Sequence, residues 1–302
     1  MKAVILAAGM GRRLTPMQWD KPKTLLAIGG TTLLGNILDS LINRGVKEAV
    51  IVVGYQGELV AQEAKRHDIE CAFVENVDFA STNTIYSLFL AREHLSNGFL
   101  YFNADVWFDP RVLDLLMGGS ADRLAVVGCS PDVKDRKGTI ARLDGEIAAD
   151  SVLVVDERRC GNEEVKVIVD GASLVTRIGK DLNPQDCAGE FIGIARFNPS
   201  ICSDLVGSLT RYCKVEPGHG GEVPGPHSRG PSQRDGLPTR RIPKEESRWT
   251  LGRGRHLFFE AALDDILSGH IVRTAALGKL RAVEIDTPED YARARGHCHG
   301  SA

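Results

Sequence analysis

The sequence predicts an α/β fold in which a mostly parallel sheet is flanked by helices and extended on one side by antiparallel strands. Two observations support this prediction. In the first half of the chain, short apolar runs alternate with helical patterns, as in parallel strands joined by right-handed crossovers. In the second half, strand-like runs follow one another with turn residues between them, which is typical of antiparallel strands. Together these patterns indicate a Rossmann-like architecture.

The parallel half begins with a strand at residues 3–7, whose continuous apolar run suits a strand covered on both faces. Thr32 is placed to cap a helix that ends at Gly45. The alternation continues with predicted strands at 49–53, 71–74 and 99–102 and predicted helices at 56–67, 83–95 and 110–117. The later strands are expected at 124–128, 139–143, 151–156, 165–170, 174–178, 191–197 and 282–285, and the later helices at 199–213, 258–267 and 288–295.

Composition excludes several classes of protein. The 37 basic and 40 acidic residues sum to −3, so the chain has no general basic surface for nucleic acid. No apolar run approaches the roughly 18 residues of a spanning helix, so no membrane partner is expected. Seven cysteines without a CxxC pair favour a reducing, cytoplasmic location. The terminal run from His297 to His299 is expected to be a frayed, inert tail.

Residues 214–254 differ from the rest of the chain. They contain six prolines and eight glycines, few apolar side chains, and eight basic against five acidic residues. Such a segment cannot bury enough apolar surface to fold by itself, so we predict a disordered insertion. The remainder forms one domain within residues 1–302.

The loop after the first strand has the composition of a phosphate-binding loop. It runs from Ala7 through Gly9 and Gly11 to Arg13, and Lys23 follows in a Lys-Pro-Lys sequence. Glycines let backbone N–H groups approach phosphate oxygens, and the basic side chains supply positive charge. The loop matches neither GxGxxG nor a P-loop, and the alternative is a turn with two solvated bases.

The strand, the GxGxRLxP sequence, the later Pro-Lys pair and an Asp at a strand end resemble the nucleoside-triphosphate transferase family, which includes sugar-1-phosphate nucleotidylyltransferases. The stretch 81–88, with the sequence STNTIYSL, resembles the phosphocholine cytidylyltransferase branch, and inositol-1-phosphate cytidylyltransferases are related to it. The resemblance covers residues 1–213 and 255–296. It implies a nucleotide-binding half at 1–120 and an acceptor-binding half at 121–213 and 255–296.

The resemblance also assigns roles to single residues. The residues implied to bind the nucleotide are Ala8, Gly9, Gly11, Arg13, Thr82 and Asn83, and those implied to take part in catalysis are Arg13, Lys23 and Asp105. Thr82 and Asn83 fall where the family holds the base, with simple helix capping as the alternative. Lys23 falls where the family's lysine contacts the phosphates of both substrates.

Carboxylates at strand ends are implied to bind magnesium. Asp105 follows the strand at 99–102, and ligands of open α/β sheets bind at such carboxyl ends. The family places a second metal-binding carboxylate at Asp286, and Glu284 shares its face of the strand. Capping of the helix that starts at Pro288 is the alternative role for Asp286 or for Thr287. Mg²⁺ prefers a few carboxylates together with phosphate oxygens.

The acceptor is implied to meet Lys23, Glu190 and Glu260. The alternatives are an ordinary surface position for Glu190 and a place on an amphipathic helix for Glu260. A choline head group needs aromatic faces. We would expect a Trp of such an aromatic cage within residues 135–143, but this stretch contains no Trp.

The activity that the resemblance implies is magnesium-dependent transfer of a nucleoside monophosphate to a small phosphorylated acceptor, with release of pyrophosphate. CTP with phosphocholine or a polyol phosphate is the first expectation. A sugar-1-phosphate enzyme that uses UTP, dTTP or GTP is the second. A non-catalytic nucleotide-sensing domain is the third. The four charged residues Arg13, Lys23, Asp105 and Asp286 argue against a sensor, which needs the loop but not the metal-binding pair.

Overall fold

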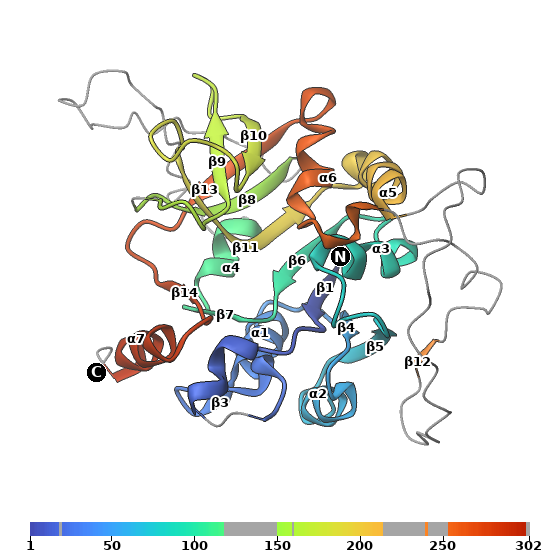
Figure 1. Cartoon of the computed structure of the whole chain (residues 1–302), viewed down its shortest axis with the longest axis vertical. Coiled ribbons are helices and arrows are strands. Elements are labelled where there is room, and N and C mark those ends of the chain that lie inside the picture. The colour runs from blue at the N-terminus through green and yellow to red at the C-terminus, as the bar shows by residue number, and fades with distance from the viewer. Residues whose placement is uncertain (18–19, 118–149, 159, 214–238, 241–252, 300–302) are drawn as a thin grey trace.

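Figure 1 shows the chain as a computed structural model, which describes residues 1–17, 20–117, 150–158, 160–213, 239–240 and 253–299. The strands predicted at 124–128 and 139–143 lie outside these ranges, and so does nearly all of the insertion predicted at 214–254. Within the described ranges, no helix combines the length and the apolarity that crossing a membrane requires.

The first half forms the predicted parallel sheet. Strand β1 (Lys2–Ala7) lies at its centre, with β4 (Glu48–Val53) on one side and β6 (Phe99–Asn103) on the other. Strand β5 (Glu70–Glu75) continues the sheet beyond β4, and β12 (Thr239–Arg240) pairs with β5 in parallel. Because these strands are parallel, their carboxyl ends meet at one edge of the sheet.

The second half adds antiparallel strands beyond β6, as predicted. Strand β11 (Gly189–Phe197) pairs with β6 and also with β8 (Ser151–Asp156) and β9 (Lys166–Val169), and β10 (Val175–Gly179) pairs with β9. Several strands were not predicted, and the longest of them lies in this half. β13 (Val272–Ala276) pairs with β8 in parallel, so the added strands are not all antiparallel. Its sequence, Val-Arg-Thr-Ala-Ala, lacks the apolar run that marks the other buried strands.

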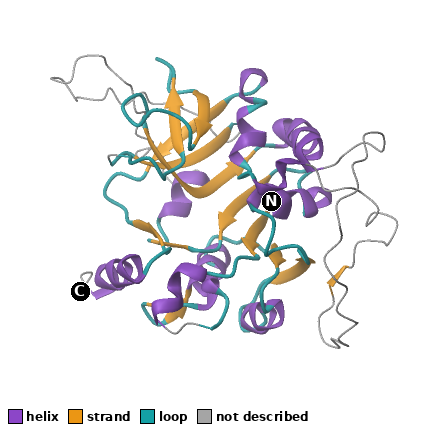
Figure 2. Cartoon of the chain, in the orientation of Figure 1, coloured by secondary structure: helices purple, strands orange, loops and turns teal. Residues whose placement is uncertain are grey.

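Helices cover both faces of the sheet (Figure 2). One core layer packs Val4 and Leu6 of β1 against α3 (Thr84–Leu90) and α5 (Pro199–Cys213). The other packs the alternate residues of β1 against α1 (Leu33–Ile42), α2 (Gly57–Ala64) and α4 (Val112–Met117). Burial on both faces explains why β1 is apolar at every position from Ala3 to Ala7.

Several helices are shorter than predicted. The pattern at 83–95 becomes α3 followed by a 3-10 turn at Arg92–His94. The helix predicted at 258–267 is α6 (Glu260–Asp264), because the chain turns at Leu267–Gly269 to enter β13. The Thr32 side chain does cap α1, accepting a hydrogen bond of 2.8 Å from the amide of Gly35.

The C-terminal segment returns to the edge of the parallel sheet. Strand β14 (Ala282–Glu284) pairs with β7 (Val106–Phe108), and α7 (Pro288–His299) follows it. The expectation of a frayed tail was wrong, because the ring of His297 stacks on Trp107 with 6.0 Å between centroids. A ring contact and a continuing helix hold this end against the domain. A small hairpin of β2 (Ala27–Ile28) and β3 (Thr31–Thr32) lies beside it.

Candidate active site

The loop after β1 forms one wall of a cavity of about 320 Å³. Ala8 and Gly9 line it, and a Cβ on Gly9 would meet no atom within 4 Å. Gly11 lies behind the loop with φ of 62°, and a Cβ there would approach the Cβ of Lys23 to 3.0 Å. Glycine at position 11 therefore lets the loop turn tightly against the segment that carries Lys23.

The cavity brings together the predicted site residues from distant parts of the sequence. Besides Ala8 and Gly9, those that line it are Arg13, Lys23, Thr82, Asn83, Asp105, Glu190, Glu260, Glu284 and Asp286. Gly11 is the predicted residue that does not line it. The cavity lies at the carboxyl ends of β1 and β6, where the sheet passes from parallel to antiparallel pairing. Ligands of open α/β sheets bind at such positions.

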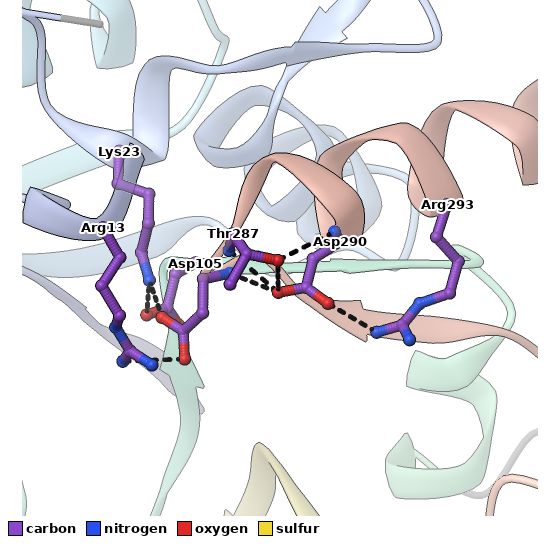
Figure 3. A network of polar contacts seen from close by, with 7 residues as sticks. Arg13, Lys23, Asp105, Thr287, Asp290 and Arg293 are labelled. Atoms are coloured by element: carbon purple, nitrogen blue, oxygen red, sulfur yellow. Dashed lines mark hydrogen bonds and ion pairs between the residues drawn. The ribbon is translucent and has the colours of Figure 1, made fainter. Parts of the chain in front are cut away.

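Lys23 lies between two carboxylates (Figure 3). Its Nζ is 2.7 Å from Oδ2 of Asp105 and 2.8 Å from Oδ1 of Asp286. Arg13 reaches the other oxygen of Asp286 at 2.9 Å. Burial lowers the pKa of Lys23, but the charges of Asp105 and Asp286 outweigh burial, so this pKa is raised overall. Burial acts to raise the pKa of Asp286, yet Lys23 and Arg13 bring it below its usual value. Lys23 and Asp286 are therefore both charged at neutral pH.

Asp290 and Thr287 cap helix α7 and leave Asp286 free to face Lys23. The carboxylate of Asp290 accepts hydrogen bonds from the amides of Asp286 and Thr287, at 3.1 and 2.9 Å, and from the Thr287 hydroxyl. The Thr287 hydroxyl in turn accepts from the amide of Asp290. This reciprocal pair is a capping box. Of the two capping residues considered from the sequence, Thr287 has that role and Asp286 does not.

Three carboxylates form a group with the chemistry of a divalent-cation site. Asp105, Glu284 and Asp286 each offer an oxygen, and these oxygens lie within 4.8 Å of one another. Oδ1 of Asp105 is buried and has no hydrogen-bond partner within the described part of the chain. Glu284 is exposed as a residue, yet the desolvation of its carboxyl in the cavity raises its pKa to about 8, and the charges of Asp105 and Asp286 add to this effect. An unpartnered oxygen among three carboxylates suits a hard cation such as Mg²⁺.

Thr82 and Asn83 lie where α3 begins. The Asn83 side chain accepts a hydrogen bond of 2.8 Å from the amide of Thr84, so it caps the helix as well as lining the cavity. The Thr82 hydroxyl accepts from Asn76 and donates to the carbonyl of Asp78. Asn76 also lines the cavity and was not predicted. Its position directly after β5 could have identified it, because site residues also come directly after the parallel strands β1 and β6.

The wall formed by the second half carries Glu190 of β11 and Glu260, the first residue of α6. Glu164 and Lys180 line the same wall and were not predicted. Both lie in connections beside β9 and β10, and no spacing or motif distinguishes them from surface residues of the same type. The chain therefore contributes both acidic and basic side chains to this wall.

Comparison with known proteins identifies the family. Residues 3–154, half of the chain, match the MobA-like NTP transferase domain. The chain belongs to this family. This transferase domain is 36% identical over 163 residues to CMP-5'-(3-aminopropyl)phosphonate synthase of Streptomyces rubellomurinus. The aligned residues make up 53% of the chain and 25% of that relative. It is 35% identical over 100 residues to choline-phosphate cytidylyltransferase of Streptococcus pneumoniae, covering 33% of the chain and 43% of the relative.

Solved structures share the fold of the transferase domain. A solved structure of CTP:phosphocholine cytidylyltransferase from Streptococcus pneumoniae superposes with a TM-score of 0.65 and 18% identity over 98% of both chains. This likeness shows that the fold is shared, including the added strands of the second half. The sequence alignments span less than half the length of either curated relative named above.

Proposed function

We propose that this transferase domain is a cytidylyltransferase that transfers CMP from CTP to a small phosphorylated alcohol, a phosphocholine-like or polyol phosphate. The observation that carries the proposal is the network of Arg13, Lys23, Asp105 and Asp286 at the carboxyl ends of the central strands. A domain that only sensed nucleotides would need the phosphate loop but not this buried arrangement of a lysine between two carboxylates. The preference for CTP rests on the cytidylyltransferase relatives.

In the proposed reaction, an oxygen of the acceptor phosphate attacks the α-phosphorus of CTP in line with the bond to the β-phosphate. The new P–O bond forms as that bond breaks, and pyrophosphate leaves with the bonding electron pair. The attacking oxygen is already ionised at neutral pH, so no side chain has to remove a proton. Arg13 and Lys23 stabilise the negative charge that develops on the transferred group. The raised pKa of Lys23 keeps its ammonium charged throughout.

We further propose that Asp105, Asp286 and Glu284 hold Mg²⁺ when the substrates bind. The ion supplies charge neutralisation on the phosphate oxygens. Asp105 and Asp286 are held by Lys23 at hydrogen-bond distance. Their orientation is therefore set by the chain before any ligand binds. The Asp290 cap fixes the backbone on which Asp286 stands.

The test is pyrophosphate release with Mg²⁺ from CTP, UTP, dTTP and GTP, each combined with phosphocholine, a polyol phosphate and a sugar-1-phosphate. Turnover with CTP and an acceptor that is not a sugar is expected. Turnover restricted to a sugar-1-phosphate would instead support a sugar nucleotidylyltransferase, and nucleotide binding without turnover on any pair would support a sensor. Lys23→Met should abolish activity, whereas Lys47→Met, which removes the charge of an exposed lysine after α1, should not.

A further inference from the structure

Three glutamates line the part of the cavity that the second half of the chain forms. Glu164 precedes β9, Glu190 lies in β11, and Glu260 begins α6. In Figure 1 these elements lie above the central strands. The ring of Phe191, next to Glu190, packs against Phe259, next to Glu260, with 6.0 Å between centroids. This ring contact links β11, which carries Glu190, to the start of α6, where Glu260 lies. Glu164, Glu190 and Glu260 are called the acidic wall below.

Two oxygens of the acidic wall are buried without a hydrogen-bond partner in the described part of the chain. They are Oε2 of Glu164 and Oε2 of Glu260. Glu260 is 4% exposed, so its side chain is largely shielded from bulk solvent. A buried carboxylate oxygen without a partner destabilises a fold by about 1–3 kcal/mol or more. Such oxygens in a cavity wall indicate a ligand that donates hydrogen bonds to them.

The nearby cations of the described chain are engaged elsewhere. The ammonium of Lys166, which is fully buried, donates to the carbonyls of Asn162, Glu164 and Lys180 at 3.1, 3.0 and 2.6 Å. Nζ of Lys180 lies 4.2 Å from the centroid of the Phe258 ring. Among the contacts described for these two lysines, neither ammonium donates a hydrogen bond to the side-chain carboxylate of Glu164 or Glu260.

Two arginines affect Glu190 only through their charge, because each forms an ion pair with another carboxylate. Arg158 is bound to Asp156, and Arg293 to Asp290. Burial raises the pKa of Glu190 to about 7, with the charges of Glu164 and Asp156 adding to it and those of Arg158 and Arg293 offsetting only part. Burial likewise raises the pKa of Glu260 to about 7, against a smaller opposing effect of Lys180. The nearby basic side chains thus offset only part of the effects that raise the pKa values of Glu190 and Glu260.

We propose that the acidic wall binds a primary ammonium group on the acceptor, so that the acceptor is an aminoalkyl phosphate. This inference rests on the proposed function, because it assumes that the phosphate of the acceptor lies beside Lys23. A primary ammonium carries three N–H donors and a positive charge, which match the unpartnered carboxylate oxygens. A hydroxyl offers one donor and no charge. A trimethylammonium offers charge but no donor.

The aromatic residues of this wall do not form a cage for a trimethylammonium. Such a cage needs free ring faces. Phe258 already carries the ammonium of Lys180. Phe191 is 3% exposed and packs against Tyr101 and Phe259. Within the described part of the chain, the wall therefore offers unpartnered hydrogen-bond acceptors to a cation, and Lys180 already lies over its exposed ring, that of Phe258.

The experiment compares three acceptors of matched length: 2-aminoethyl phosphate, its N-trimethyl derivative and 2-hydroxyethyl phosphate. Both kcat/KM with CTP and Mg²⁺, and binding of each acceptor by calorimetry, are measured. The amine should be preferred by at least about tenfold in both measurements, because a site built to bind hydrogen-bond donors rejects analogues that lack them. Glu260→Gln and Glu164→Gln should each reduce this preference. Glu58→Gln, an exposed position on α2, should retain it.

The outcomes separate this inference from the proposed function. Turnover with an equal or greater preference for the trimethyl or hydroxyl acceptor would overturn the inference and leave the proposed function intact. Amine-selective binding without pyrophosphate release from any acceptor would contradict the proposed function while supporting the ammonium site. An unchanged amine preference in both glutamate variants, each shown to be folded by circular dichroism, would overturn the acidic wall as the binding group.

Discussion

Two groups of carboxylates line the same cavity and differ in how their charge is balanced. Asp286 lies within hydrogen-bond distance of Lys23 and Arg13, and these cations lower its pKa. Glu260 is buried without such a partner, and its pKa is raised to about 7. The same chemical group is thus ionised at Asp286 and titrates near neutral pH at Glu260, as it also does at Glu284, which no lysine or arginine of the described chain contacts directly. Paired carboxylates suit phosphate and metal chemistry, whereas unpaired ones suit a cationic ligand.

The largest expected effect tests the paired group. Asp105→Asn keeps the shape of the side chain but removes its charge beside Lys23, so kcat should fall by about 100- to 1000-fold or more. Steady-state pyrophosphate release measures the loss, and circular dichroism checks the fold. Asp68→Asn makes the same change at an exposed position and should leave kcat unaltered. Full activity of the Asp105 variant would exclude this carboxylate from the reaction.

A second prediction concerns the support of the acidic wall. Lys166→Met removes the fully buried ammonium that three carbonyls share as donor, so the free energy of unfolding should fall by about 2–4 kcal/mol. The KM of the acceptor should rise more than that of CTP, because the carbonyls of Glu164 and Lys180 lose their common anchor. Denaturant titration and kinetics measure the two effects, with Lys47→Met as the exposed control. Equal changes in both KM values would show that Lys166 supports the fold but does not position the wall.

The unpaired group predicts a pH dependence of stability. The pKa of Glu260 in the folded protein is about 7, above the ordinary value of 4.5. Near pH 4.5 the carboxyl is neutral in the folded state, and as pH rises through about 7 it must ionise while buried, which destabilises the fold. Glu260→Gln should therefore be more stable than the wild type by up to about 3 kcal/mol at pH 8, and similar to it near pH 4.5.

Denaturant titration at the two pH values checks this prediction. Glu58→Gln, which changes an exposed glutamate in the same way, should show no pH-dependent difference from the wild type. A Glu260 variant that differs from the wild type by the same amount at both pH values would mean that folding does not shift the pKa of Glu260. The two groups of carboxylates would then not differ in ionisation.

The smallest expected effect concerns the cap behind the paired group. Asp290→Ala removes the acceptor for the amides of Asp286 and Thr287, so stability should fall by about 1 kcal/mol and the KM of CTP should rise a few-fold. Arg293→Ala removes only the exposed partner of Asp290 and should change stability by less than about 0.5 kcal/mol. If both variants behave alike, the cap does not orient Asp286.

Much of the parallel half could be predicted from local sequence. Strands β1, β4 and β6 are covered on both faces, so their apolar runs are continuous and easily recognised. Strand β13 was missed because its burial depends on β8, which lies more than a hundred residues earlier in the chain. The ends of α3 and α6 were also misplaced, because the turns that follow them depend on where the next strand docks.

The site divides in a similar way. Gly9 and Arg13 follow β1 and Asp105 follows β6, strands whose carboxyl ends meet, so their position in a shared cavity could be predicted, whereas the role of Lys23 was implied by the family resemblance. Asp286 was predicted from a family resemblance, and its free carboxylate depends on the cap formed by Thr287 and Asp290. Glu164 and Lys180 lie outside any motif, and their place in the wall depends on contacts with Lys166.

Local sequence was enough to locate the central parallel strands and to recognise the loop that follows the first one, because apolar periodicity and glycine spacing are local properties. The tertiary structure alone decided which carboxylates are paired. Asp286 meets Lys23 across 263 residues of sequence, while Glu260 is buried where the described chain offers its Oε2 no partner. The ionisation of a carboxylate depends on the charges and the solvent around it, and those are set only when distant segments pack together.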